Sequence, residues 1–139
     1  MKSNILIIDF ESDVRRNLES VLRKEGYNVR GASSREEVID FFKSESFDLA
    51  IMDIRIPGTN GLELIKEVKE LGDDIDVIVL TGSASIENAV KALRDYRVFD
   101  FLCKPLESLD QLTGTVKRAL QKNSLPKDKA VSRKLKQGL

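Results

Sequence analysis

Short apolar runs alternate along the chain with longer stretches of helical spacing, and this alternation restricts the fold more than any other feature. Three continuous runs cover residues 5–8, 49–52 and 77–80, a fourth segment over residues 98–103 is apolar apart from Asp100, and a weaker one covers residues 27–32. Continuous apolar runs of this length are typical of strands buried on both faces, as in a parallel sheet. In the intervening stretches apolar residues recur every three or four positions, which indicates helices. The alternation therefore predicts an α/β domain, with a doubly wound, five-stranded parallel sheet flanked by five helices.

Local signals indicate where two of these helices begin and end. Ser12 is the expected N-cap of the first helix, and Gly26 is expected to end it. Ser34 and Glu37 have the spacing of a capping box at the start of the second helix. These signals support the division of the sequence into short strands and longer helices.

The length of 139 residues suits one folded domain, which can bury a core without a metal or a disulfide. The composition changes at Asn123, because residues 123–139 carry a formal charge of +4, against −4 for residues 1–122. We therefore expect a folded unit over residues 1–122 and a basic linker or C-terminal tail over residues 123–139.

The composition also excludes whole classes of function. With 0 His, the sequence cannot support Ser-His-Asp or Cys-His catalysis, or a zinc site that uses histidine. With 1 Cys, it cannot form an internal disulfide, which suits a reducing cytoplasm; Cys103 lies in an apolar run and is expected to be buried and inert. No apolar run could span a membrane, and the formal net charge of +0 argues against a uniformly basic nucleic-acid binder. We expect a cytoplasmic protein whose folded unit contacts neither membrane nor nucleic acid directly.

Chemically capable side chains follow four of the five predicted strands. Asp9 follows the first strand, with Glu11 close behind it, and Asp53, Thr81 and Lys104 end the third, fourth and fifth strands. The carboxyl ends of parallel strands meet at one edge of the sheet, where ligands bind in such folds. Clustered carboxylates suit Mg²⁺, which prefers oxygen ligands. A carboxylate can also attack phosphorus, while a metal, a lysine and a hydroxyl neutralise the phosphoryl oxygens.

Each of these residues alone has a simpler interpretation. An acid at a strand end often faces solvent or caps the next helix, Thr81 suits a turn, and Lys104 suits a solvated surface. The coincidence of four such residues at one edge of the sheet favours a functional site.

The residues at this edge resemble those of bacterial response-regulator receiver domains, the phospho-acceptor modules of two-component regulatory systems. The resemblance covers about residues 3–121 and implies a flavodoxin-like fold. It also implies a phosphoprotein that acts in signal transduction and is no metabolic enzyme, because it catalyses only its own phosphorylation and dephosphorylation. The motifs that carry the resemblance are Asp9-Phe10-Glu11, the segment DIRIPGTNG that begins at Asp53, Leu80-Thr81-Gly82, and Phe101-Leu102-Cys103-Lys104-Pro105.

The resemblance implies a phospho-acceptor centred on Asp53. A partner histidine kinase or phosphotransfer protein would phosphorylate this residue in the presence of Mg²⁺. The metal would be held by Asp9, Asp53 and the backbone carbonyl of Arg55. Thr81 and Lys104 would contact the phosphoryl oxygens.

The resemblance also implies a switch that carries the modification to the protein surface. Thr81 would move towards the phosphoryl group and Phe101 would swing inward. In the family the fourth helix, fifth strand and fifth helix often mediate dimerisation or effector contact, and the peptide between Lys104 and Pro105 is typically cis. The sequence has no room for an effector domain, so we expect either a stand-alone protein or part of a longer regulator.

One position departs from the family pattern. The family places a second acid, a direct ligand of Mg²⁺, where this sequence has Phe10, and phenylalanine cannot coordinate a metal. Glu11 is adjacent and longer than aspartate, so it is a candidate replacement ligand. We therefore expect weakened Mg²⁺ binding and phosphorylation. The alternative is that Phe10 packs over the first helix and the metal site rearranges around water.

Two other functions stay open. A receiver-like interaction module that signals without phosphorylation is the main alternative, and Phe10 motivates it. An aspartyl phosphatase is the second alternative. Such enzymes commonly use an acid two residues after the nucleophile, and here that residue is Arg55.

Overall fold

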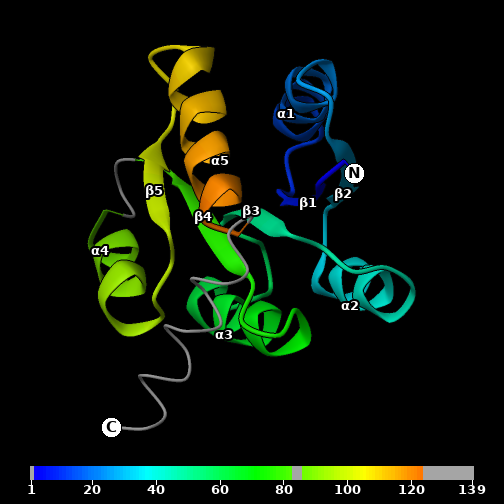
Figure 1. Ribbon diagram of the computed structural model, residues 1–139. Coiled ribbons are helices and arrows are strands. Elements are labelled where there is room, and N and C mark those ends of the chain that lie inside the picture. Colours follow the sequence, from blue (N-terminus) through cyan, green and yellow to red (C-terminus); the bar gives the residue numbers. More distant parts are fainter. Residues whose placement is uncertain (1, 83–85, 124–139) are drawn as a thin grey trace, which may run out of the picture.

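Five strands and five helices alternate along the chain, in a computed structural model that describes residues 2–82 and 86–123. All strand pairs are parallel, in the order β2-β1-β3-β4-β5, so the predicted doubly wound α/β fold is confirmed. The elements, drawn in Figure 1, are β1 (Asn4–Ile8), α1 (Ser12–Lys24), β2 (Asn28–Ala32), α2 (Arg35–Ser44), β3 (Leu49–Asp53), α3 (Gly61–Leu71), β4 (Asp76–Thr81), α4 (Ile86–Asp95), β5 (Asp100–Cys103) and α5 (Leu109–Asn123).

The sheet separates two hydrophobic clusters, because successive side chains of a strand point to opposite faces. In β1, Leu6 and Ile8 belong to one cluster, and Ile5 and Ile7 belong to the other. Helices α2, α3 and α4 cover the first face, whereas α1 and α5 cover the second (Figure 1). Every residue of β3 and β4 is buried, which explains the continuous apolar runs over residues 49–52 and 77–80.

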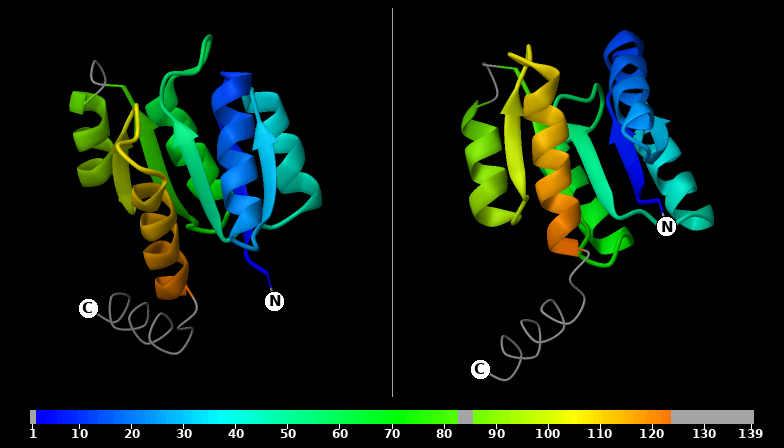
Figure 2. Two further views of the ribbon diagram at one scale, coloured as in Figure 1. Left: turned by 90° about the horizontal axis from the view of Figure 1, so that it is seen from above. Right: turned by 45° about the horizontal axis from the view of Figure 1, so that its top comes forward.

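The strand order changes direction beside β1, and this positions the site. The chain passes from β1 outward to β2 and then returns to place β3 on the other side of β1. The strands end along one edge of the sheet, opposite the N-terminus of the described chain (Figure 2). In such sheets the crevice at the point of reversal binds ligands. Asp9 directly follows β1 and Asp53 ends β3, so both carboxylates lie at this crevice.

The helix signals were partly correct. Gly26 ends α1 with a positive φ of 94°, as expected. Ser12, however, is the first helical residue and Glu11 occupies the N-cap position, because the Glu11 amide donates to the Asp9 carboxylate at 3.0 Å and fixes the turn. Ser34 caps α2 by accepting from the Glu37 amide at 3.2 Å. The Glu37 carboxylate closes this turn on Ser33 instead of Ser34.

Cys103 lies in a different environment from the one its sequence predicts. Cys103 is exposed, which corrects the prediction of a buried thiol; it is the last residue of β5, a strand at the margin of the sheet. The expected basic tail lies outside the described residues from 124 onward, so the boundary at 122/123 stays a prediction.

Among residues 2–82 and 86–123, no helix has the length and apolarity needed to cross a membrane.

Candidate functional site

Lys104 joins the two buried carboxylates at the crevice. Its ammonium Nζ lies 2.7 Å from Asp9 Oδ2 and 2.8 Å from Asp53 Oδ2. Asp9 is fully buried and Asp53 is 4% exposed, so these contacts lie in a region of low dielectric constant. Burial by itself would lower the pKa of Lys104, but hydrogen bonds and charge attraction from Asp53 and Asp9 outweigh it and raise this pKa above its usual value. Lys104 is therefore protonated at neutral pH and neutralises part of the acidic cluster.

Both the side chain and the backbone carbonyl of Asp9 form hydrogen bonds that hold the turn between β1 and α1. The Asp9 side chain accepts from the Glu11 amide, and the Asp9 carbonyl accepts from the guanidinium Nη1 of Arg15 at 2.8 Å. Sequence reasoning missed Arg15, because no motif signals a contact that depends on how α1 returns over the turn. Together the two contacts hold the turn that carries Asp9.

The loop after β3 orients the predicted acceptor. The Arg55 amide donates to Asp53 Oδ1 at 2.8 Å, which leaves the second carboxylate oxygen to Lys104. The loop then packs tightly against the start of α3, where a Cβ on Gly61 would lie 1.9 Å from the Ile54 carbonyl oxygen. Asn60 caps α3 by accepting from two backbone amides. The sequence signal for this loop was its run of turn residues.

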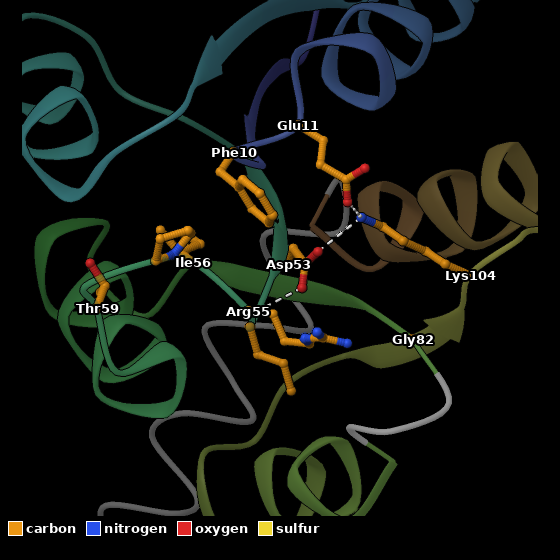
Figure 3. A pocket seen from close by; sticks show the side chains of 10 residues that line it. Phe10, Glu11, Asp53, Arg55, Ile56, Thr59, Gly82 and Lys104 are labelled. Carbon is orange, nitrogen blue, oxygen red and sulfur yellow. Dashed lines mark hydrogen bonds and ion pairs between the residues drawn. The ribbon is translucent and has the colours of Figure 1, made fainter.

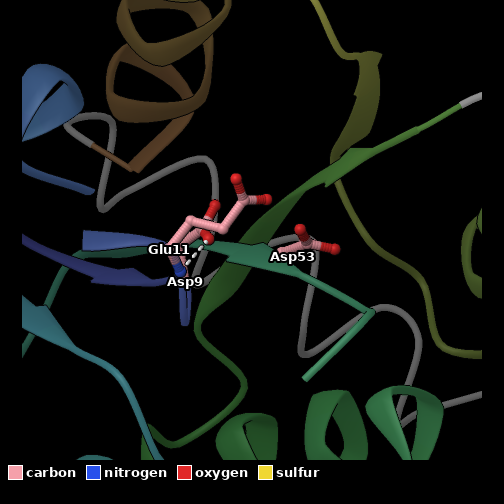
Figure 4. Close-up of side chains that lie close together, drawn as sticks. All are labelled: Asp9, Glu11 and Asp53. Carbon is pink, nitrogen blue, oxygen red and sulfur yellow. Dashed lines mark hydrogen bonds between the residues drawn. The ribbon is translucent and has the colours of Figure 1, made fainter. Parts of the chain in front are cut away.

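Three carboxylates are close enough together to share one cation. Asp9, Glu11 and Asp53 each offer an oxygen, and these oxygens lie within 4.8 Å of one another (Figure 4). Oxygen donors of this kind match the preference of Mg²⁺, so the residues present fit the metal. Glu11 is half exposed and its carboxylate lies 3.9 Å from the Lys104 ammonium, so it occupies the rim of the cluster. Glu11 therefore lies close enough to Asp9 and Asp53 to be a candidate ligand, and its role as a ligand stays a prediction.

Phe10 lines a cavity that opens beside Asp53. The cavity has a volume of about 450 Å³. Figure 3 shows the Phe10 ring pointing towards Asp53, opposite Lys104. Phe10 is 42% exposed and belongs to neither hydrophobic cluster. The remaining lining residues lie in the quoted sequence motifs, but sequence reasoning gave them no role at a cavity; they are Ile54, Ile56, Pro57, Thr59 and Gly82.

The two expected switch residues lie at different depths. Thr81 is fully buried at the end of β4, and its hydroxyl donates to the Gly82 carbonyl at 3.1 Å. Phe101 is partly buried and packs against the cluster under α4. The peptide between Lys104 and Pro105 is cis, as expected. The Thr81 hydroxyl therefore has a hydrogen-bond partner on its own strand end in this arrangement.

Known proteins resemble this chain in sequence and in fold. The sequence pattern of the response regulator receiver domain matches residues 5–117. Regulatory protein AtoC of Escherichia coli K12 is 36% identical over 126 residues, which cover 91% of this chain and 27% of AtoC. Response regulator MprA of Mycobacterium bovis BCG is 33% identical over 132 residues, 95% of this chain and 56% of MprA. A crystal structure of a receiver domain protein from Clostridium thermocellum matches with a TM-score of 0.80 and 30% identity, and covers 88% of this chain and 98% of that one.

These similarities agree with the geometry of the site and with the parallel sheet. The chain spans about a quarter of the length of AtoC and just over half that of MprA. The similarities therefore concern only the part of each relative that matches this chain. The family pattern covers more than three quarters of the chain, and the fold extends over the same residues. The chain belongs to the response regulator receiver domains of two-component signalling.

Proposed function

We propose that this receiver domain is a phosphorylation-controlled switch that accepts a phosphoryl group on Asp53 from a partner histidine kinase or phosphotransfer protein. The observation that carries the proposal is the Lys104 ammonium, hydrogen-bonded to Asp53 at the floor of an open cavity. A carboxylate in this position is a nucleophile with an adjacent cation to neutralise the phosphoryl oxygens. The Arg55 amide holds the other oxygen and so fixes the orientation of the carboxylate.

Asp9, Glu11 and Asp53 would hold Mg²⁺, and the family adds the backbone carbonyl of Arg55. When bound, the metal supplies positive charge that offsets the negative charge of the phosphoryl group. Glu11 would take over the ligand position that the family gives to the residue at Phe10. Because Glu11 is half exposed and mobile side chains cost entropy to fix, we expect this substitute ligand to bind the metal less tightly.

Phosphorylation would change the surface through Thr81 and Phe101. A phosphoryl group on Asp53 adds about −1.5 to −2 charge and new acceptor oxygens. The Thr81 hydroxyl would exchange the Gly82 carbonyl for one of these oxygens, and Phe101 would follow into the space above β4. The output surface would be α4, β5 and α5, which would contact a second copy or an effector domain in a longer chain.

Intact-mass spectrometry after incubation with phosphoramidate and Mg²⁺ tests the proposal. We expect the mass of one phosphoryl group on the wild-type chain and none on Asp53→Asn. Asp100→Asn is the matched control, because Asp100 is an acid at the start of β5, away from the cavity. A wild-type chain that gains no mass, or an Asp53→Asn variant that gains as much as wild type, would contradict the proposal.

The second candidate is an interaction module that signals without phosphorylation. The exposed Phe10 ring favours it, since an apolar side chain at the mouth of the site could bind a partner directly. The two candidates differ in the same experiment, because the interaction module gains no phosphoryl group under any donor. An equal affinity of wild type and Asp53→Asn for a partner would favour this second function.

A further inference from the structure

The Phe10 ring is in an unusual place for a large apolar side chain. It is 42% exposed, and it points over an acidic cavity instead of into either hydrophobic cluster. Exposed apolar area is unfavourable in water, so the ring gains stability from any apolar group that covers it. Ile54, Ile56 and Pro57 are further apolar residues that line the same cavity.

The opposite wall of the cavity is polar and charged. Lys104 and the Asp53 carboxylate lie there, joined by a hydrogen bond. The Arg55 guanidinium lies beside Gly82, 3.6 Å from where a Cβ on that residue would be, and both residues line the cavity. A ligand that fits both walls carries a phosphoryl group at one end and, at the other, a flat aromatic ring that can stack on Phe10. A phosphorylated imidazole ring has this chemistry, whereas acetyl phosphate and phosphoramidate offer the phosphoryl group without a ring.

We infer that Phe10 is a specificity-determining residue that stacks on the imidazole ring of a phosphohistidine donor and favours it over donors without a ring. This rests on the proposed function of Asp53 as acceptor. In the transfer, a carboxylate oxygen of Asp53 forms the new P–O bond while the P–N bond to the ring breaks. The bonding electron pair stays on the ring nitrogen, and the ring leaves as neutral imidazole when its other nitrogen carries the proton. Phe10 takes no part in these bond changes and acts by positioning the ring.

The experiment compares two donors that share the P–N bond and differ in the ring, namely monophosphoimidazole and phosphoramidate. Second-order rate constants for phosphorylation of the whole chain are measured at fixed, saturating Mg²⁺ by intact-mass spectrometry. The variants are Phe10→Leu, which stays apolar but loses the ring, and Phe10→Tyr, which keeps it. Leu71→Ala is the matched control, because Leu71 is also 42% exposed but lies at the end of α3, outside the cavity.

We expect Phe10→Leu to lower the ratio of the monophosphoimidazole rate to the phosphoramidate rate by about three- to tenfold, the range for aromatic pairs beyond simple apolar burial. Phe10→Tyr and Leu71→Ala should leave this ratio within about twofold of wild type. A Phe10→Leu ratio equal to that of wild type, or equal losses with both donors, would overturn the inference while leaving Asp53 as the acceptor. No phosphorylation of the wild-type chain by either donor would overturn the proposed function, and the inference with it.

Discussion

Replacing Lys104 with methionine removes the ammonium group that lies 2.7 and 2.8 Å from the buried carboxylates of Asp9 and Asp53. Methionine keeps most of the length and apolar surface of lysine, so the change is mainly one of charge. Breaking a buried ion pair costs about 3–5 kcal/mol, because the partner charge stays buried without compensation. The Lys104 side chain is one-fifth exposed, so water can replace part of the lost interaction, and we take the lower value of about 3 kcal/mol.

A loss of about 3 kcal/mol corresponds to a fall in Tm of roughly 10 °C for a chain of this size without Mg²⁺. The same variant should bind Mg²⁺ more tightly, because two unit charges at 4 Å interact by about 4 kcal/mol in a partly buried site and the ammonium repels the incoming cation. Even a third of this repulsion would tighten the affinity by about tenfold. Binding at 100 times the dissociation constant returns about 2.7 kcal/mol, which should restore most of the lost stability.

Thermal unfolding monitored by circular dichroism, with and without Mg²⁺, measures both effects. Lys122→Met is the matched control, since Lys122 pairs with the buried Asp76 at 3.4 Å at the opposite edge of the sheet. We expect it to lower Tm by an amount that Mg²⁺ does not restore. A Lys104→Met variant with the wild-type Tm in the absence of Mg²⁺, or with an unchanged response to the metal, would refute the reasoning that Lys104 and the cation neutralise the same carboxylates.

Three further predictions concern parts of the chain outside this ion cluster. The hydrogen bond from Ser33 lowers the pKa of the Glu37 carboxyl in the folded protein. The ionised carboxylate therefore stabilises the fold above the pKa of unfolded glutamate, about 4.3, and this stabilisation is lost as pH falls through the lower pKa of the folded state. Glu37→Gln should therefore flatten the acid limb of a Tm–pH profile. Gly61→Ala should lower the free energy of unfolding by about 3 kcal/mol in urea titrations, because its Cβ would meet backbone, whereas Gly114→Ala in α5, with its nearest atom 3.5 Å away, should raise it by about 0.5–1 kcal/mol. The exposed Cys103 should react fully with a thiol reagent such as DTNB in the native state, and slow reaction that needs denaturant would show a buried thiol.

The strand ends show what the sequence could predict. Asp53 and Thr81 follow apolar runs in which every residue is buried, so both the strands and the candidate site residues that end them were recognisable. The same rule failed for Cys103, because β5 is at the margin of the sheet and only Leu102 of this strand is buried. An apolar run identifies a strand, but it does not say which strand lacks a neighbour.

Contacts between elements were harder to predict. The hydrogen bond from Arg15 to the Asp9 carbonyl depends on how α1 crosses the end of β1, and residue spacing contains no such information. The direction of the Phe10 ring is a similar case. Comparison with the family pattern indicated that phenylalanine replaces an acid at this position, but only the structure shows the ring aimed into the cavity beside Asp53.

The absence of a charge at Phe10 has two opposite effects on phosphorylation, one through the metal and one through the anionic donor. Asp9, Glu11 and Asp53 contribute three negative charges and Lys104 one positive charge, which leaves a formal −2 that one divalent cation would neutralise. A further acid at position 10 would attract the cation more strongly, but it would also repel a phosphoryl dianion, because like charges this close oppose each other. With phenylalanine there, the attraction for metal falls and the barrier to an anionic donor falls with it. Weaker metal binding therefore does not by itself imply slower phosphorylation, provided that the donor offers a group that the ring can hold.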